Sequence, residues 1–446
     1  MNERTITNTD NWIKQWSRGM KIQRGIFYAI AIGKPFEKIF ATSLDSWLYV
    51  SRGEAVDFYA KEDQLQTFSI YMKRKLMEDE SFSHLIVSNY EQLYQPHLRF
   101  LNQLDKMDLA KLSNDELILL LDQYRKSLCP YGSAIWLVVT IEKEMEEVAY
   151  ETFKNMKVND IEKWTSTLFS LTQPNYILEE ELALLQISQL SAQKQEAALH
   201  EHAKKFEYIP LYDYDYEPYS LAYFKKRLDE LNTDPNAKNH IAEKEKNVKQ
   251  NAKKLEQLLS TPIINEKEKL RLRMLNALFN HKDQRSHYRS IDSYMGKKIY
   301  DELASRVKLS LSNLLFLTDE EITEKLNNPN KQIDLEPRRK GYALIVEHGR
   351  VELLTGKSMQ DYLKKNLFEE MKNQITGLSV TPGFVKGVAR VILHPSEISK
   401  IQQNDILVTP MTRPDYVSFM KKCAAIVTDE GGMLCHAAIV SRELNI

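Results

Sequence analysis

The chain has few of the residues that build disulfide frameworks, metal sites and nucleotide-binding loops. Only three cysteines, Cys129, Cys423 and Cys435, occur among 446 residues, and none has the paired spacing of a zinc site or a disulfide framework. Nine of the 14 glycines are spread thinly over residues 1–376, whereas a loop that wraps phosphates in backbone amides needs clustered glycines. The sequence therefore predicts reduced thiols, no metal site and no bound cofactor or ATP site of its own.

The chain also lacks a net charge and a long apolar run. Its 61 basic residues are balanced by 62 acidic residues, so there is no overall field to attract nucleic acid or anionic lipid. No apolar run approaches the roughly 18 residues that a membrane span needs, and residues 1–10 lack the features of a secretory signal. We therefore expect a cytoplasmic protein with neither nucleic acid nor a membrane as partner.

The first 370 or so residues have the apolar spacing of helices. Two capping boxes, at Ser113–Glu116 and Thr318–Glu321, mark helix starts, because each side chain satisfies amides that the first turn leaves unpaired. This region is predicted to be mainly α. The three- and four-residue period is clearest at Leu112, Leu117, Leu120, Leu121 and Tyr124.

A break in this pattern comes at 208–219, where two prolines alternate with tyrosines and acidic residues. The following stretch, 238–259, is rich in Lys and Glu and predicts a solvated helix or a mobile arm. We expect a subdomain boundary between these segments and the preceding helices. The expected domains are a helical domain over 1–207, a second helical subdomain over 208–375 and a third domain over 376–446.

The last domain differs in composition, since five glycines fall within 377–432. Turn residues at 376–387 lead into a predicted strand at 388–393, and further short apolar strands are predicted at 406–409 and 424–428. Helical stretches are expected at about 396–402 and 414–422. The sequence therefore predicts a small α/β module.

His436 is the strongest candidate for chemistry. It follows the pair Gly431-Gly432 and opens a predicted helix that ends at Leu444. The glycines let the backbone turn and offer amides to a phosphate, and the helix N-terminus favours a dianion. The same position favours the neutral, nucleophilic imidazole. A lone histidine is more often a capping or half-buried residue, but the surrounding pattern favours a phosphohistidine.

The run from Thr428 to Leu444, with Gly-Gly-x-x-Cys-His-Ala-Ala-Ile-Val-x-Arg-Glu-Leu, closely resembles the phosphohistidine signature of the PEP-utilising enzymes. That group includes phosphoenolpyruvate synthase, pyruvate phosphate dikinase and rifampicin phosphotransferase. Residues 377–391 and 405–416 resemble other strands of the same module, so the resemblance covers about 377–446. It implies a swivelling domain that takes phosphate from an ATP-grasp domain, with ATP and Mg bound there, and it implies roles for His436 as phosphoacceptor and Thr428, Gly431 and Gly432 as phosphate-binding residues.

Three further residues are secondary candidates. Cys435 stands where relatives carry Ser or Cys and is interpreted as a small residue that packs beside His436. Arg442 lies six residues past His436, which is not a same-face position on a helix, so packing or docking is expected of it. Arg413 is able to meet phosphate during docking, although Thr412 and Pro414 together are more simply explained as a helix start.

The helical region offers weaker candidates. Residues 262–375 resemble in pattern the helical segment of rifampicin-phosphotransferase-like proteins. A row of arginines at 271, 273, 285 and 289 fits the binding of a phosphate or a phosphorylated partner, but arginines on helices are more often solvated or ion-paired. The tyrosines in 208–219 fit a substrate cleft or an aromatic plug equally well. His200 and His202 are two apart on a helix and point apart, so a metal would need ligands from elsewhere.

Two departures from the family shape the functional hypothesis. The chain contains no ATP-grasp domain, and relatives continue beyond the position of Ile446, so we expect an incomplete module. The first hypothesis is a phosphotransferase that carries phosphate on His436 from a separate ATP-grasp protein to a small-molecule acceptor. The alternatives are a non-catalytic binding or regulatory protein with a vestigial module, and phosphoenolpyruvate chemistry through a separate barrel.

Overall fold

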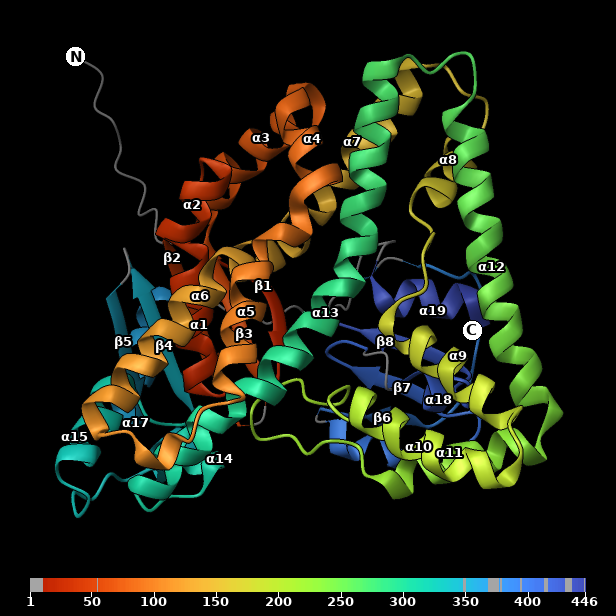
Figure 1. The fold of residues 1–446 in the computed structure, drawn as a ribbon. Coiled ribbons are helices and arrows are strands. Elements are labelled where there is room, and N and C mark those ends of the chain that lie inside the picture. The colour runs from red at the N-terminus through yellow and green to blue at the C-terminus, as the bar shows by residue number, and fades with distance from the viewer. Residues whose placement is uncertain are drawn as a thin grey trace, which may run out of the picture. The chain divides into compact units, whose positions relative to one another are not determined.

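The computed structural model of the protein describes residues 11–53, 55–347, 350–367, 377, 379–393, 395–412, 416–429, 435–444 and 446. Chain contacts divide it into two compact units, one made of residues 1–71 with 312–446 and the other of residues 72–311. Figure 1 shows the elements of both units. Within these described ranges, no helix is long and apolar enough to cross a membrane.

A five-stranded antiparallel sheet organises the first unit. Its order is β1-β3-β2-β4-β5, so strands from the start of the chain pair with strands from beyond residue 340. The central pairing joins β2 to β4, with Trp47 opposite Val346 and Tyr49 opposite Leu344. The strands are β1 (Trp12–Arg18), β2 (Ser46–Ser51), β3 (Val56–Lys61), β4 (Tyr342–Glu347) and β5 (Arg350–Thr355).

Both faces of this sheet are covered, because successive side chains of a strand point to opposite sides. On one face Leu48, Val50 and Ile345 pack with Met359 and other residues of α17. On the other face, helix α1 approaches so closely that a Cβ at Gly25 would lie 3.2 Å from Leu344. The helices of this unit outside the C-terminal module are α1 (Ile22–Ile32), α2 (Lys34–Phe40), α14 (Leu311–Leu314), α15 (Asp319–Asn327), α16 (Glu336–Lys340) and α17 (Gly356–Asn366), and α3 (Glu62–Glu78) continues into the second unit.

All the regular secondary structure described in the second unit is helical. The 41-residue helix α13 (Glu266–Arg306) runs through it and packs on α4, α5 and α6 (Figure 1). The other helices are α4 (Glu80–Asn89), η1 (Tyr90–Leu93), α5 (Gln95–Leu104), η2 (Leu109–Lys111), α6 (Asn114–Thr140), α7 (Glu142–Asn155), α8 (Ile161–Leu168), α9 (Tyr176–Ser188), α10 (Ala192–Phe206), α11 (Leu221–Thr233) and α12 (Pro235–Leu259).

A buried ionic cluster joins three of these helices. The Glu180 carboxylate of α9, 2% exposed, accepts a hydrogen bond from His202 Nε2 of α10 at 2.8 Å and another from Arg227 Nη1 of α11 at 2.5 Å. The Glu180 carboxylate raises the pKa of Arg227 against the opposing effect of burial. Around the cluster, apolar residues from α9, α10, α11 and α12 form one core.

The C-terminal module of the first unit is a parallel sheet with helices on one face. Its order is β6-β7-β8, formed by β6 (Ala389–Val391), β7 (Ile406–Thr409) and β8 (Ala425–Thr428). Leu407, fully buried, packs with Ile401, Met420 and Val440. The covering elements are η3 (Pro395–Lys400), α18 (Val417–Met420) and α19 (His436–Leu444).

The predicted fold class is confirmed: a mainly helical region precedes a small α/β module, and its three strands fall where they were expected. Both capping boxes form, at Ser113 with Glu116 and at Thr318 with Glu321. The five-stranded sheet was not predicted. The expected boundaries after 207 and 375 stay predictions, although β2 and β4 lie in different predicted domains and pair with each other.

Removing the charge of Glu180 should strongly destabilise the helical unit. In Glu180→Gln, Arg227 and His202 lose the buried carboxylate that they share, and breaking such a cluster costs about 3 kcal/mol. Urea unfolding followed by circular dichroism measures the change. Glu181→Gln, whose partner Lys244 is more exposed, is the matched control and should cost less than about 1 kcal/mol. Equal losses in both variants would contradict a structural role for the cluster.

The module should lose stability in acid through Asp405. The hydrogen bonds from Arg390 Nε, at 3.0 Å, and from the Gln402 amide hold the pKa of Asp405 below its ordinary value. A lowered folded pKa adds stability above the unfolded value, about pH 4, which is lost as the pH falls through the folded value. Asp405→Asn lacks this contribution. The gap in unfolding midpoint between wild type and Asp405→Asn should therefore narrow below about pH 4, and a constant gap would contradict the assignment.

Candidate functional site

The candidate site lies where strands β7 and β8 end. The two strands are parallel, and their last residues, Thr409 and Thr428, are register partners. Because parallel strands present their carboxyl ends at the same edge, the loops that follow them meet there. One loop contains Thr412 and the other leads to His436.

His436 is the first residue of helix α19. The residue before it, Cys435, ends the loop: its carbonyl accepts the Ile439 amide at 3.0 Å, and its Sγ accepts the Ala438 amide at 3.4 Å. A thiol thus takes the capping place that Ser or Thr commonly fills. The first turn of a helix has unpaired amides and a positive dipole end, so the surroundings of the imidazole favour an anion.

The imidazole is oriented by Thr412. Thr412 Oγ1 lies 2.7 Å from His436 Nδ1, within hydrogen-bond distance, and Thr412 is only 3% exposed. His436 itself is half-buried. A ring whose Nδ1 is held by a buried hydroxyl has a fixed plane. Its second nitrogen, Nε2, therefore has a defined direction for chemistry.

The structure brings three of the predicted site residues to this edge or to its helix. Thr428 is half-buried at the end of β8, Cys435 caps α19 and Arg442 lies exposed in the last turn of that helix. Gly431, Gly432 and Arg413 lie outside the described residues. Their phosphate-binding and docking roles stay predictions.

Thr412 is the site residue that the sequence interpretation missed. It was explained with Pro414 as a helix start, an interpretation that stays a prediction because residues 413–415 lie outside the described residues. What the interpretation did not include is the contact of the Thr412 hydroxyl with His436. A hydroxyl in the loop directly after a parallel strand was the available signal, since such loops gather at the edge where ligands bind.

At the start of the module, the backbone at Gly387 lies very close to the backbone at Asn404. Gly387 precedes β6, and a Cβ at this position would lie 2.5 Å from the carbonyl oxygen of Asn404. No side chain fits at that distance. On the same segment, the Val388 carbonyl accepts the Ile406 amide at 2.8 Å and aligns the segment with β7.

In the helical unit the predicted arginine row has structural contacts. Arg271 Nη2 donates to the carbonyl of Met77 at 2.5 Å, Arg273 pairs with Glu256 at 2.9 Å, and Arg285 Nε donates to the carbonyl of Lys282. The fourth arginine, Arg289, lies over the ring of Tyr212 at 4.5 Å. These contacts support the interpretation of the row as an ion-pair and packing network.

Three tyrosines of 208–219, Tyr208, Tyr212 and Tyr214, pack on α13. Tyr214 is fully buried and its hydroxyl lies 2.9 Å from that of Tyr124, while the Tyr212 hydroxyl lies 3.1 Å from Ser286 Oγ. Such contacts are those of an aromatic plug over the helical core. The two histidines of α10 also separate, with His200 exposed and His202 bound to Glu180. Among the described residues, no group of three or more His, Cys, Asp or Glu side chains is arranged to hold a metal.

Comparison with known proteins identifies the module. Residues 401–446 match the family described as PEP-utilising enzyme, mobile domain. A probable phosphoenolpyruvate synthase of Archaeoglobus fulgidus is 42% identical over 145 residues, which cover 30% of this chain and 19% of that protein. The phosphoenolpyruvate synthase of Pyrococcus furiosus is 56% identical over 78 residues, or 18% of this chain and 10% of that protein. That of Aquifex aeolicus is 38% identical over 135 residues, covering 28% and 16%.

These comparisons assign the module, and each spans only a small part of its relative. The three matches cover between 10% and 19% of the relatives' own length. Two of them extend over 135 and 145 residues, well beyond the 46 residues from 401 to 446. The family likeness therefore reaches upstream of the part of the module that contains His436.

Replacing Thr412 by valine should release the imidazole. Valine keeps the shape of threonine without its hydroxyl, so Nδ1 of His436 loses this partner, at a cost of about 1 kcal/mol in stability. Nitrogen NMR of the imidazole should show the Nδ1 resonance shifted in Thr412→Val and close to wild type in Thr412→Ser. An unchanged Nδ1 resonance in the valine variant would contradict the contact.

Proposed function

We propose that this chain, whose C-terminal module belongs to the PEP-utilising enzyme mobile-domain family, carries a phosphoryl group on His436 between a phosphoryl donor and an acceptor. The reaction class is phosphoryl transfer through a covalent enzyme intermediate. The observation that supports it best is the short contact between Thr412 Oγ1 and His436 Nδ1 at a helix N-terminus.

In the proposed mechanism the two ring nitrogens have different tasks. When Nδ1 carries the proton and donates it to Thr412 Oγ1, the lone pair of Nε2 is available for attack. Nε2 forms a bond to the donor's phosphorus while the bond from phosphorus to the leaving oxygen breaks, and that oxygen keeps the electron pair. In the second step an acceptor oxygen attacks phosphorus and the bond to Nε2 breaks, which restores the neutral imidazole.

The surroundings suit the phosphorylated state. A phosphoryl group on Nε2 is dianionic near neutral pH, and the positive dipole end of α19 stabilises negative charge there. In this proposal the hydroxyl of Thr428, at the same strand edge, donates to a phosphoryl oxygen. The Gly431-Gly432 pair would add backbone amides to this set.

The donor in this proposal is a separate ATP-grasp domain or protein, which binds ATP and Mg²⁺. ATP binding and its Mg²⁺ ion are assigned to that partner. The acceptor is a small molecule bound elsewhere in the assembly. The proposal places the relay in the cytoplasm, where ATP is supplied.

The names of the relatives favour one specific variant of this function. The Pyrococcus furiosus and Aquifex aeolicus relatives are named phosphoenolpyruvate synthases, so pyruvate is the first acceptor to test. It would need a pyruvate-binding domain in the assembly. Pyruvate-dependent loss of label from the phosphorylated chain would distinguish this variant from transfer to another acceptor.

Labelling should locate the phosphoryl group on His436. The chain is incubated with radiolabelled ATP and an ATP-grasp domain from a phosphoenolpyruvate synthase, and in parallel with phosphoramidate, a chemical donor that needs no partner. We expect an acid-labile, base-stable phosphate on wild type, because a phosphorus–nitrogen bond hydrolyses in acid, and a reduction of at least tenfold in His436→Ala.

His200→Ala is the matched control, since His200 is an exposed histidine on helix α10, far from His436 in the sequence. This variant should label as well as wild type. Equal labelling of wild type and His436→Ala with both donors would reject His436 as the carrier. Absence of label in wild type with both donors would favour the binding or regulatory alternative.

A further inference from the structure

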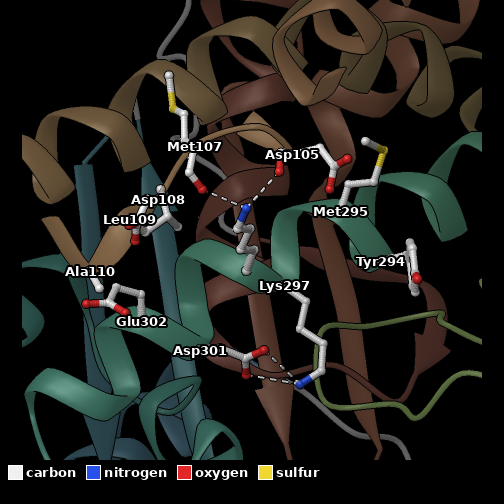
Figure 2. A pocket seen from close by; sticks show the side chains of 11 residues that line it. Asp105, Met107, Asp108, Leu109, Ala110, Tyr294, Met295, Lys297, Asp301 and Glu302 are labelled. Atoms are coloured by element: carbon white, nitrogen blue, oxygen red, sulfur yellow. Dashed lines mark hydrogen bonds and ion pairs between the residues drawn. The ribbon is translucent and has the colours of Figure 1, made fainter. Parts of the chain in front are cut away.

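The helical unit contains a pocket of about 810 Å³ between the loop after α5 and helix α13. Figure 2 shows that its lining side chains come from these two elements, with residues 105–110 on one side and residues 294–302 on the other. Its volume is that of a site for a small organic ligand. All its lining residues belong to the unit formed by 72–311.

Negative charges outnumber positive charges in the lining of this pocket. Four carboxylates and two lysines line it. Lys298 is held in the wall, where its Nζ donates to the carbonyls of Leu104, Asp105 and Met107 at 3.4, 2.9 and 2.8 Å. The second lysine, Lys297, pairs with Asp301 at 3.0 Å. Both positive groups are therefore occupied within the protein.

Asp105 differs from the other acids of the pocket. Asp108 pairs with Lys111, Asp301 with Lys297 and Glu302 with Arg306. Within the described parts of the chain, the exposed Asp105 carboxylate has no hydrogen bond or ion pair from another side chain. One carboxylate is thus available to an incoming cation.

Apolar side chains are exposed at the same place. Tyr294 is 37% exposed and Met107 is 41% exposed, although both are large enough to be costly in contact with water. The Tyr294 hydroxyl donates to Glu207 Oε1 at 2.5 Å, which holds the ring in place. Burial, the bond to Glu207 and the nearby Asp105 carboxylate raise the pKa of Tyr294 to about 12. The ring therefore stays neutral and faces a negative surrounding.

We propose that this pocket binds a small organic cation, with an ammonium group paired to Asp105 and an apolar arm against Tyr294, Met107 and Met295. An aromatic face attracts cations, and a thioether packs well on flexible or ring-shaped groups. An ion pair at an exposed carboxylate gives modest affinity, so the apolar contacts supply much of the binding. This site does not depend on phosphoryl transfer by His436.

Isothermal titration calorimetry with three probes tests the charge requirement. The probes are 2-phenylethylamine, 2-phenylethanol and 3-phenylpropionate, which share a ring and carry a positive, a neutral and a negative group. We expect saturable binding of the amine, about fivefold weaker binding of the alcohol, and none of the carboxylate. Binding of the amine should weaken as salt rises. No saturable binding of the amine, or equal binding of all three, would overturn the proposal.

Two variants test the position of the ligand. Asp105→Asn should weaken binding of the amine about fivefold, the size expected for one exposed ion pair. The separate variant Tyr294→Ala should weaken binding of the amine by a larger factor. Asp229→Asn, another exposed aspartate on a helix, is the matched control and should bind like wild type. Thermal unfolding checks that each variant is folded. Unchanged affinity in folded Asp105→Asn would place any bound amine elsewhere and overturn the assignment.

Discussion

The contact between Thr412 and His436 is the constraint on which the site depends. It joins the loop after β7 to the first residue of α19, two segments that are 24 residues apart in the chain. The parallel pairing of β7 with β8 makes this contact possible, because it presents both loops at one edge. The hydrophobic core that contains Leu407 of β7 and Val440 of α19 fixes the position of α19 relative to the sheet. Orientation of one imidazole thus draws on most of the module's packing.

The helical unit uses polar groups in a different way. Its buried charges are shared among helices, as Glu180 is between His202 and Arg227. Another buried set contains Asp292, which accepts from His97 Nε2 at 3.0 Å and from the Tyr124 hydroxyl. The carboxylates of both sets are buried, and the sets specify which helices pack together. They belong to the scaffold, whereas the exposed pocket beside Asp105 faces solvent.

Local sequence signals predicted much of the fold and the position of His436 at the start of a helix. Capping boxes, the helical apolar period and the glycine-rich start of the module each act within a few residues, so Ser113, Thr318 and the strands of the module were found. The residue that opens α19, His436, was found in the same way. Thr412 was missed because its partner lies in another loop, and no local pattern reports a contact made across a sheet edge. The sheet of β1 to β5 was missed for a related reason: β2 is buried on both faces, so it has no alternating pattern, and its neighbour β4 is far away in the chain.

That long-range pairing has a consequence for how the protein is made. Trp47 of β2 pairs with Val346 of β4, so about 300 residues must leave the ribosome before the sheet can close, since domains form as the chain is synthesised. Until then one edge of β2, a run of six buried residues in the finished protein, has no strand to pair with. An unpaired apolar edge is a template for association with other chains. In each newly made chain the helical unit is complete before the sheet is. The protein is therefore most exposed to association with other chains before β4 and β5 have been synthesised.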